Sequence, residues 1–211
     1  MEIYSFKTLP STQQYLFEKI KTGELKVPVA VLAFNQIAGL GSRENTWSGG
    51  EGNFFASFAI SLDRLPEDLV LSSASIYFSF IMKKVLNGLG EKIWLKWPND
   101  FYLDQDKVGG TITQKIDNVL ICGIGINLKN EQHGFKALRS EIRAEKLLNL
   151  YLEALDKFPA WKHIFSEYQV EFEQSRSFSV HVEKSKKSLA GAILCHDGSL
   201  ILEGKRVFSL R

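Results

Sequence analysis

The sequence has few of the features that mark secreted, membrane-spanning or nucleic-acid-binding proteins. Only two of its 211 residues are cysteines, and Cys122 and Cys195 lack metal-type spacing, which favours a reduced, cytoplasmic environment. Its 26 basic and 24 acidic residues give a net charge of +2 without a long block of one sign. Neither a nucleic acid nor a membrane is therefore expected as a partner. The most apolar helix-like run, 69–82, contains four serines and is too short to span a bilayer.

The sequence does contain enough apolar side chains for a sizeable core. Hydrophobic residues make up 45% of the chain, and its length suits one domain with a small appendage. Patterning and capping signals predict strands at 2–6, 27–36, 54–62, 93–97, 107–115 and 118–128, and helices at 12–21, 66–89, 142–157 and 159–173. We therefore predict an α+β domain at 1–176, with a mixed β-sheet and flanking helices, and a small all-β domain at 177–211.

The predicted strand at 118–128 has two unlike faces. In LICGIGINL, residues 120–128, alternate positions are all apolar and belong to the core. The opposite face carries Gly123 and Gly125, which leave a bare strip of backbone, and ends at Asn127. Glycine inside a strand loses packing and costs backbone entropy. Either a ligand or another segment of the protein should therefore approach this strip closely.

The preceding strand is expected to supply polar groups beside that strip. Simple alternation divides it into a polar face and an opposite face. The polar face holds Lys107, Gly109, Thr111 and Thr113, and the opposite face holds Val108, Gly110 and Ile112. If the turn at Asp117 and Asn118 is tight, the polar face lies beside the glycine strip. Lys107 then stands at the mouth of a shallow site.

Two further segments are candidates for ligand binding. In KWPND, residues 96–100, Pro98 interrupts the strand, so Asn99 and Asp100 are expected at a strand end. Residues 37–53 are glycine-rich and are expected to form an irregular loop, whose consecutive N–H groups can make an anion-binding nest. Arg43 would add a planar charge for a phosphate or carboxylate. An ordinary turn and an ordinary surface loop are the alternative interpretations.

Taken in order, these motifs resemble those of the biotin–protein ligase family, also called biotin–[acetyl-CoA-carboxylase] ligases. The pentapeptide at 96–100 is identical to the family signature, and KVGG at 107–110 and GIGIN at 123–127 match two further motifs. STQQYL at 11–16 and QIAGLGSRENTW at 36–47 are similar to the family's first two motifs. The resemblance covers nearly the whole chain.

The resemblance implies a catalytic domain like that of class II aminoacyl-tRNA synthetases, followed by an SH3-like β-barrel-type domain. It also implies that MgATP converts biotin to biotinyl-5′-AMP, and that the biotinyl group then passes to a lysine of a biotin carboxyl carrier protein. The implied catalytic residues are Lys107, Asp100 and Arg43, with Asp100 also as a Mg²⁺ ligand. The implied biotin-binding residues are Ser11, Thr12, Gln13, Gln36, Gly39, Gly41, Lys107, Gly109, Gly110 and Gly123. The implied ATP-binding residues are Arg43, Trp47, Lys96, Asn99, Asp100, Gly125, Asn127 and Arg211.

One motif, the loop at 36–47, departs from the family pattern. The four departures, where the family often has Arg, Arg, Gly and Arg, are Leu40, Ser42, Glu44 and Asn45. The loop therefore has fewer positive charges, and weaker retention of the adenylate is expected. No helix-turn-helix precedes the first motif, which predicts a monofunctional ligase without a DNA-binding domain.

The alternative functions are a lipoate–protein ligase-like acyltransferase and a non-catalytic biotin-binding module. The unchanged pentapeptide argues against the first, and the presence of Lys107 and Asp100 argues against the second. The resemblance also leaves open whether the protein forms a homodimer.

Overall fold

The fold is organised around one seven-stranded sheet. The computed structural model describes residues 1–41, 46–129, 136–182 and 185–209, and the sheet has the strand order β1-β2-β5-β9-β8-β7-β6. Its strands are β1 (Glu2–Phe6), β2 (Val29–Ala33), β5 (Phe54–Ser61), β6 (Ile93–Lys96), β7 (Asp100–Leu103), β8 (Asp106–Ile116) and β9 (Val119–Ile126). β1 and β2 are parallel, and the other neighbouring pairs are antiparallel.

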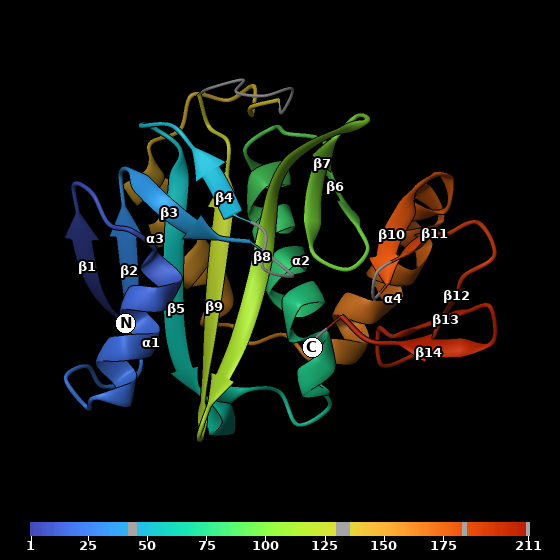
Figure 1. Ribbon diagram of the computed structural model, residues 1–211, viewed down its shortest axis with the longest axis horizontal. Coiled ribbons are helices and arrows are strands. Elements are labelled where there is room, and N and C mark those ends of the chain that lie inside the picture. Colours follow the sequence, from blue (N-terminus) through green and yellow to red (C-terminus); the bar gives the residue numbers. More distant parts are fainter. Residues whose placement is uncertain (42–45, 130–135, 183–184, 210–211) are drawn as a thin grey trace.

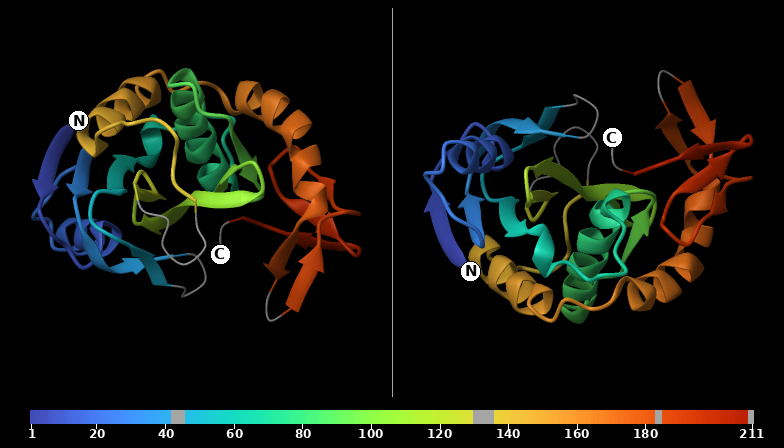
Figure 2. Two further views of the ribbon diagram at one scale, coloured as in Figure 1. Left: turned by 90° about the horizontal axis from the view of Figure 1, so that it is seen from above. Right: turned by 90° about the horizontal axis from the view of Figure 1, so that it is seen from below.

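Helices cover both faces of this sheet. They are α1 (Thr12–Lys21), α2 (Ala74–Gly88), α3 (Ala144–Leu155) and α4 (Trp161–Glu171), with 3-10 turns η2 (Leu62–Arg64), η3 (Leu71–Ser73) and η4 (Phe172–Ser177). Figure 2 shows α2, α3 and α4 in a row on one face and α1 on the other. A separate hairpin of β3 (Gln36–Leu40) and β4 (Thr46–Gly49) crosses the α1 face (Figure 1). The expected α+β class with a mixed sheet is confirmed.

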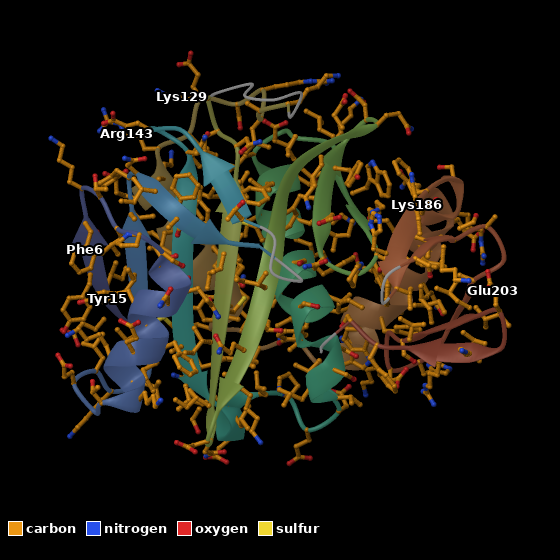
Figure 3. The ribbon with its side chains drawn as sticks, viewed as in Figure 1. Phe6, Tyr15, Lys129, Arg143, Lys186 and Glu203 are labelled. Atoms are coloured by element: carbon orange, nitrogen blue, oxygen red, sulfur yellow. The ribbon has the colours of Figure 1, made fainter. Side chains whose placement is uncertain are left out.

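Helix α1 begins and ends where the sequence predicts. Ser11 Oγ accepts a hydrogen bond from the Gln14 backbone N–H at 3.3 Å, which satisfies one of the free donors at the helix start. The ring of Tyr15 then packs on Phe6 at the end of β1, with centroids 4.9 Å apart (Figure 3). The cap and this aromatic contact hold the first turn of α1 against the sheet.

Alternation along the strands divides the apolar side chains between two core layers. In β5, Phe54 and Phe58 belong to the large cluster that includes the α2 and α3 side chains. Ala59 belongs to the small cluster that includes Leu16 of α1. The small layer does not extend under the β3–β4 hairpin, and this part of the α1 face holds the cavity described below.

Several expectations about the elements are wrong. Residues 37–53 contain the hairpin β3–β4 rather than only irregular loop, because the many glycines hide its alternation. The helix expected from Pro66 begins at Ala74. The segment before it instead contacts α4, where Asp68 accepts the backbone N–H groups of the first turn. The missed strand β7 follows Asn99 directly in a tight hairpin with β6.

The last part of the chain forms two small sheets. One pairs β10 (Ser179–Val182) with β11 (Ser185–Ser188), and the other joins β12 (Ile193–Leu194), β13 (Leu200–Leu202) and β14 (Lys205–Val207). Figure 1 shows them at one end of the molecule, beside α4 and beyond β6 and β7. The predicted division between residues 176 and 177 falls inside η4 and stays a prediction. Within the described ranges, no helix has the length and apolar character needed to cross a membrane.

Candidate active site

A cavity that is partly open to solvent lies on the α1 face of the sheet. It lies between the start of α1, the β3–β4 hairpin and strands β5, β9 and β8, and small-molecule ligands bind in concave sites of this kind. It is lined by Ser11, Thr12, Gln13, Gln36, Leu40, Gly41, Trp47, Phe55, Ser57, Asn99, Asp100, Lys107, Gly110, Thr111, Ile112, Gly123, Ile124 and Gly125. The fold thus brings together residues from every one of the motifs described above.

One end of the cavity is polar and uncharged. The backbone N–H of Thr12 donates to Gln36 Oε1 at 2.9 Å, and the Thr12 and Ser57 hydroxyl oxygens lie 2.8 Å apart. All three residues are buried. Because hydroxyl and carboxamide groups both donate and accept, this end can recognise a neutral polar group that does the same.

Gln13 lies directly over the glycine strip. A Cβ atom added to Gly123 would lie 2.6 Å from Gln13 Oε1 and 3.1 Å from Ser57 Oγ. Among the residues that the structure describes, Gln13 Oε1 is buried without a hydrogen-bond partner. An unsatisfied buried acceptor costs free energy, so this oxygen marks a position where a ligand N–H group would be stabilised.

Trp47 of β4 covers the second glycine of the strip. A Cβ atom on Gly125 would lie 2.8 Å from the Trp47 indole, so only glycine allows the ring to rest on β9. The indole Nε1 is a buried donor without a partner in the described part of the chain. The strip is thus approached by protein side chains, and both of these carry an unused polar atom into the cavity.

The opposite end of the cavity is charged. Lys107 Nζ lies 2.5 Å from Asp100 Oδ1, and Lys96 Nζ lies 3.5 Å from Asp100 Oδ2. The carboxylate therefore stands between two ammonium groups. The ring of Tyr102 lies 5.7 Å from Lys96 Nζ, and burial, with smaller contributions from the carboxylates of Asp100 and Asp106, raises the pKa of Tyr102 to about 12.

A β-bulge aims Lys107 into the cavity. Tyr102 pairs with Lys107 and Phe101 with Gly109, so Val108 is an extra residue in β8. The extra residue puts Lys107 on the same face as Gly110, and a Cβ atom on Gly110 would lie 3.8 Å from Lys107 Cε. Bulges often re-aim a side chain beside a functional site.

The predicted faces of β8 were therefore wrong. Gly110 pairs with Gly125 and Ile112 with Gly123, so these residues share the face of the glycine strip. Thr111 and Thr113 lie opposite Ile124 and Cys122, on the face of the large core. The bulge explains the error, because simple alternation cannot count a residue that is added on one strand alone.

Asn99 forms the tip of the β6–β7 hairpin and is tied to β8. Its Nδ2 donates to the Thr111 carbonyl oxygen, and its own carbonyl oxygen accepts the Thr111 N–H at 2.9 Å. These two bonds fix the hairpin beside the cavity wall. The adjacent carboxylate of Asp100 is consequently held at a defined distance from Lys107.

Comparison with known proteins identifies the family. Residues 5–130 match the model of the Biotin/lipoate A/B protein ligase family. The chain belongs to this family. The biotin acetyl coenzyme A carboxylase synthetase of Helicobacter pylori, solved with bound biotinylated ATP, superposes with a TM-score of 0.94 at 36% identity, covering 98% of this chain and 99% of that one. The resemblance seen in the sequence is confirmed.

Other ligases of the family match over different lengths. The bifunctional ligase/repressor BirA of Escherichia coli strain K12 is 34% identical over 127 residues, which are 57% of this chain but 38% of BirA. The biotin protein ligase of Aquifex aeolicus, in complex with biotin and ATP, has a TM-score of 0.76 at 20% identity over 100% of this chain and 96% of its own. At that identity the superposition shows the fold alone.

Most of the expected biotin/lipoate ligase residues line the cavity, and four described ones do not. These are Gly39, Lys96, Gly109 and Asn127. Gly39 and Gly109 allow close packing, since a Cβ atom would lie 2.2 Å from Gln36 Nε2 and 2.6 Å from the Gly125 carbonyl oxygen, respectively. The Asn127 side chain donates to the Lys136 carbonyl oxygen at 3.3 Å. Arg43 and Arg211 lie outside the described residues.

Six residues of the cavity lining were not among the expected binding residues. They are Leu40, Phe55, Ser57, Thr111, Ile112 and Ile124. One signal was available, because Ser57 is the one polar residue among the otherwise apolar residues 54–60 of the sequence. Its partner across the ladder is Gly123, so the hydroxyl faces the bare strip. The sequence did not reveal this pairing, since strand order and register depend on the whole sheet.

The residues of this ligase-family site do not fit a resident metal ion. Both oxygens of Asp100 face ammonium groups, and a divalent cation would have to displace them. No cluster of three or more His, Cys, Asp or Glu residues able to hold a metal occurs within the described ranges. Mg²⁺ prefers several oxygen ligands, including substrate phosphates, so it fits better as part of MgATP than as a permanent ligand of Asp100.

Proposed function

We propose that this protein is an ATP-dependent biotin–protein ligase. It joins biotin to MgATP, forming biotinyl-5′-AMP and pyrophosphate, and then transfers the biotinyl group to a lysine of a biotin carboxyl carrier protein. The observation that carries this proposal is the layout of the cavity described above. A neutral end with an unused buried acceptor, a glycine floor and a lysine–carboxylate pair follow one another in one small space.

The charged end suits the first half-reaction. A carboxylate oxygen of biotin attacks the α-phosphorus of ATP, and the bond from that phosphorus to the bridging oxygen of pyrophosphate breaks. Two anions must approach, so fixed positive charge stabilises the transition state more than the separated substrates. Lys107 supplies that charge, and Asp100 holds its ammonium group at the cavity wall while Lys96 balances the carboxylate.

The enclosed middle of the cavity suits the second half-reaction. The deprotonated amine of a carrier lysine attacks the carboxyl carbon of the mixed anhydride, and AMP leaves with the electron pair of the broken carbon–oxygen bond. Water would destroy this anhydride, so exclusion of water protects the intermediate. The β3–β4 hairpin covers this region, and Trp47 rests its ring on Gly125 there.

The neutral end favours biotin over lipoate. The ureido group of biotin presents two N–H donors and one carbonyl acceptor, whereas the dithiolane ring of lipoate presents neither strong donors nor strong acceptors. Gln13 Oε1 lacks a donor within the described part of the chain, and Thr12 and Ser57 offer hydroxyl groups beside it. A site with buried polar groups rejects a ligand that leaves them unpaired.

The test is pyrophosphate release from MgATP with biotin, with lipoate and with neither. The proposal expects pyrophosphate release from MgATP when biotin is present, and no release with lipoate or with neither acid. Release with lipoate would favour the lipoate-ligase alternative, and tight biotin binding without release would favour the non-catalytic binding module.

A further inference from the structure

Trp97, inside the pentapeptide at 96–100, is bonded away from the cavity. Its side chain is fully buried. The indole Nε1 donates to the Gly198 carbonyl oxygen at 2.8 Å, and the backbone N–H donates to Ser175 Oγ at 3.2 Å. Both donors therefore reach residues in or beyond η4, about 80 to 100 positions further along the chain.

The turn that receives the indole is held from several sides. Gly198 has a φ of 74°, and a Cβ atom there would lie 2.9 Å from Ile76 Cδ1, so a left-handed glycine is required in a tight space. Trp161 Nε1 donates to the His196 carbonyl oxygen at 2.8 Å, and Ser73 Oγ donates to the Asp197 carbonyl oxygen. We call residues 196–199 the clamped turn.

Trp97 is also close in sequence to two residues that line the cavity, Asn99 and Asp100, which follow it by two and three positions. Asn99 is bonded to Thr111 on β8, and Asp100 pairs with Lys107. The hairpin tip is thus fixed to β8 in front and, through Trp97, to the clamped turn behind. A carboxylate that must hold an ammonium group needs support on both sides, because small displacements change such a pair strongly.

We infer that Trp97 is a positioning residue that lets the C-terminal part of the chain set the place of Asp100, and through it of Lys107, during adenylate formation. The inference rests on the proposed function. Trp97 does not line the cavity, so its effect passes through the hairpin tip. Its loss should slow the reaction without weakening recognition at the neutral end, which is built from α1, β3 and β5.

Trp161→Phe supplies a matched control for Trp97→Phe. Each change removes one indole N–H from the clamped turn and keeps an aromatic ring, and both tryptophans are buried. Only Trp97 lies in the hairpin that carries Asn99 and Asp100. A purely structural role predicts that the two variants behave alike, whereas the positioning role predicts that they differ.

The kinetic readout is kcat and KM for biotin in pyrophosphate release. A misplacement well under 1 Å is expected to lower kcat about tenfold in Trp97→Phe, with KM for biotin within about twofold of the unchanged protein. Trp161→Phe should keep kcat within about twofold. Ser175→Ala removes only the hydrogen bond to the Trp97 backbone N–H and should also lower kcat, but by a smaller factor. It replaces Trp97→Phe as the test variant if Trp97→Phe fails to fold. Equal kcat values in these variants and in Trp161→Phe would overturn the inference.

Hydrogen exchange by mass spectrometry gives a readout that needs no activity. Trp97→Phe and Ser175→Ala should speed exchange in residues 99–111, and Trp161→Phe should not. If the unchanged protein released no pyrophosphate, the proposed function would fail while exchange still decided the role of Trp97. Unaltered exchange at 99–111 in both test variants would contradict it.

Discussion

The two hairpins beside the cavity are anchored in different ways. The β6–β7 hairpin belongs to the central sheet, and its tip is bonded to β8 in front and to the clamped turn behind. The β3–β4 hairpin is a sheet of its own, joined to the segment before α1, and its Ile37 is 69% exposed. The difference suggests a division of work: one hairpin supplies a preformed electrostatic frame, and the other supplies a cover that can adapt to a ligand.

The outer edge of β6 shows how the rigid hairpin is secured. An edge strand has unpaired N–H groups, and here Leu95 N–H donates to Glu171 Oε1 at 2.7 Å while Trp97 N–H donates to Ser175 Oγ at 3.2 Å. The donors belong to Leu95 in β6 and to Trp97 just after it, and the acceptors belong to Glu171 at the end of α4 and to Ser175 in η4. The junction of α4 and η4 therefore satisfies both edge donors.

The largest effect is predicted for removal of the Lys107 charge, which Asp100 of the β6–β7 hairpin holds in place. Lys107→Ala should lower adenylation by about 3–4 kcal/mol, roughly 10²–10³-fold in rate, because one preorganised charge at the reacting centre is lost. Its side chain is 27% exposed, so the fold should persist. Lys115→Ala, an exposed lysine on the same strand, is the control. Pyrophosphate release near that of the unchanged protein would remove Lys107 from its role.

A change at the outer edge should loosen the rigid hairpin without touching the cavity. Glu171→Ala removes the acceptor of Leu95 N–H and leaves Lys83 without its mostly buried partner. We expect about 2 kcal/mol less stability toward urea, as for a hydrogen bond to a charged group. Glu167→Ala, which breaks the exposed pair with Lys84, should cost under about 1 kcal/mol. Equal losses of stability in the two variants would mean that the Glu171 contact stabilises the protein no more than an exposed ion pair does.

A third change tests how far the Gln13 side chain of α1, which lies over the glycine strip, can give way. Gly123→Val should weaken biotin binding more than folding, because the new side chain collides first with the flexible end of Gln13. Overpacking costs about 1–3 kcal/mol, and here most of it should appear in the binding free energy measured by calorimetry. Gly88→Ala meets nothing within 4 Å and should leave affinity unchanged. Normal biotin affinity in folded Gly123→Val would show that Gln13 moves away freely.

The smallest predicted effect concerns the contribution of the clamped turn to stability at acidic pH. Burial disfavours the charged form of Asp197, but hydrogen bonds from Ser199 and Arg206 outweigh it and lower the pKa below the ordinary value of 3.8. A lowered pKa contributes stability above that value, and the contribution is lost as the pH falls below it. The side chain of Arg206 is 53% exposed, so solvent screening keeps the loss under about 1 kcal/mol.

Urea titrations at several acidic pH values check this last prediction. Asp197→Asn should be less stable than the unchanged protein at neutral pH and should approach it as the pH falls through and below 3.8. A constant difference between the two proteins across that range would show that the charge on Asp197 does not contribute.

Local signals predicted much of the fold. Ser11 marked the start of α1, and alternation identified β5 and the two faces of β9 correctly. The same reasoning failed at Val108, where one extra residue reverses the faces of β8. It also failed for β3–β4, where the many glycines hide the alternation. The edge contact of Glu171 joins segments far apart in the sequence and has no local signal.

The candidate site was predictable where motifs carried it and unpredictable where tertiary packing decided. Lys107, Asp100 and Gly123 all line the cavity. The sequence did not reveal that Asp100 stands between two lysines, because Lys96 and Lys107 meet only through the hairpin pairing. The expectation of a Mg²⁺ ligand at Asp100 did not include these two neighbouring lysines, and their charge is the reason that the site does not fit a resident ion.

The central claim is most directly tested by mass spectrometry of a biotin carboxyl carrier domain incubated with biotin, MgATP and this protein. The account predicts one biotinyl group in amide linkage to a single lysine, formed only when biotin and MgATP are both present and nearly absent with Lys107→Ala. An unmodified carrier domain, or one that accepts a lipoyl group in place of biotin, would contradict it.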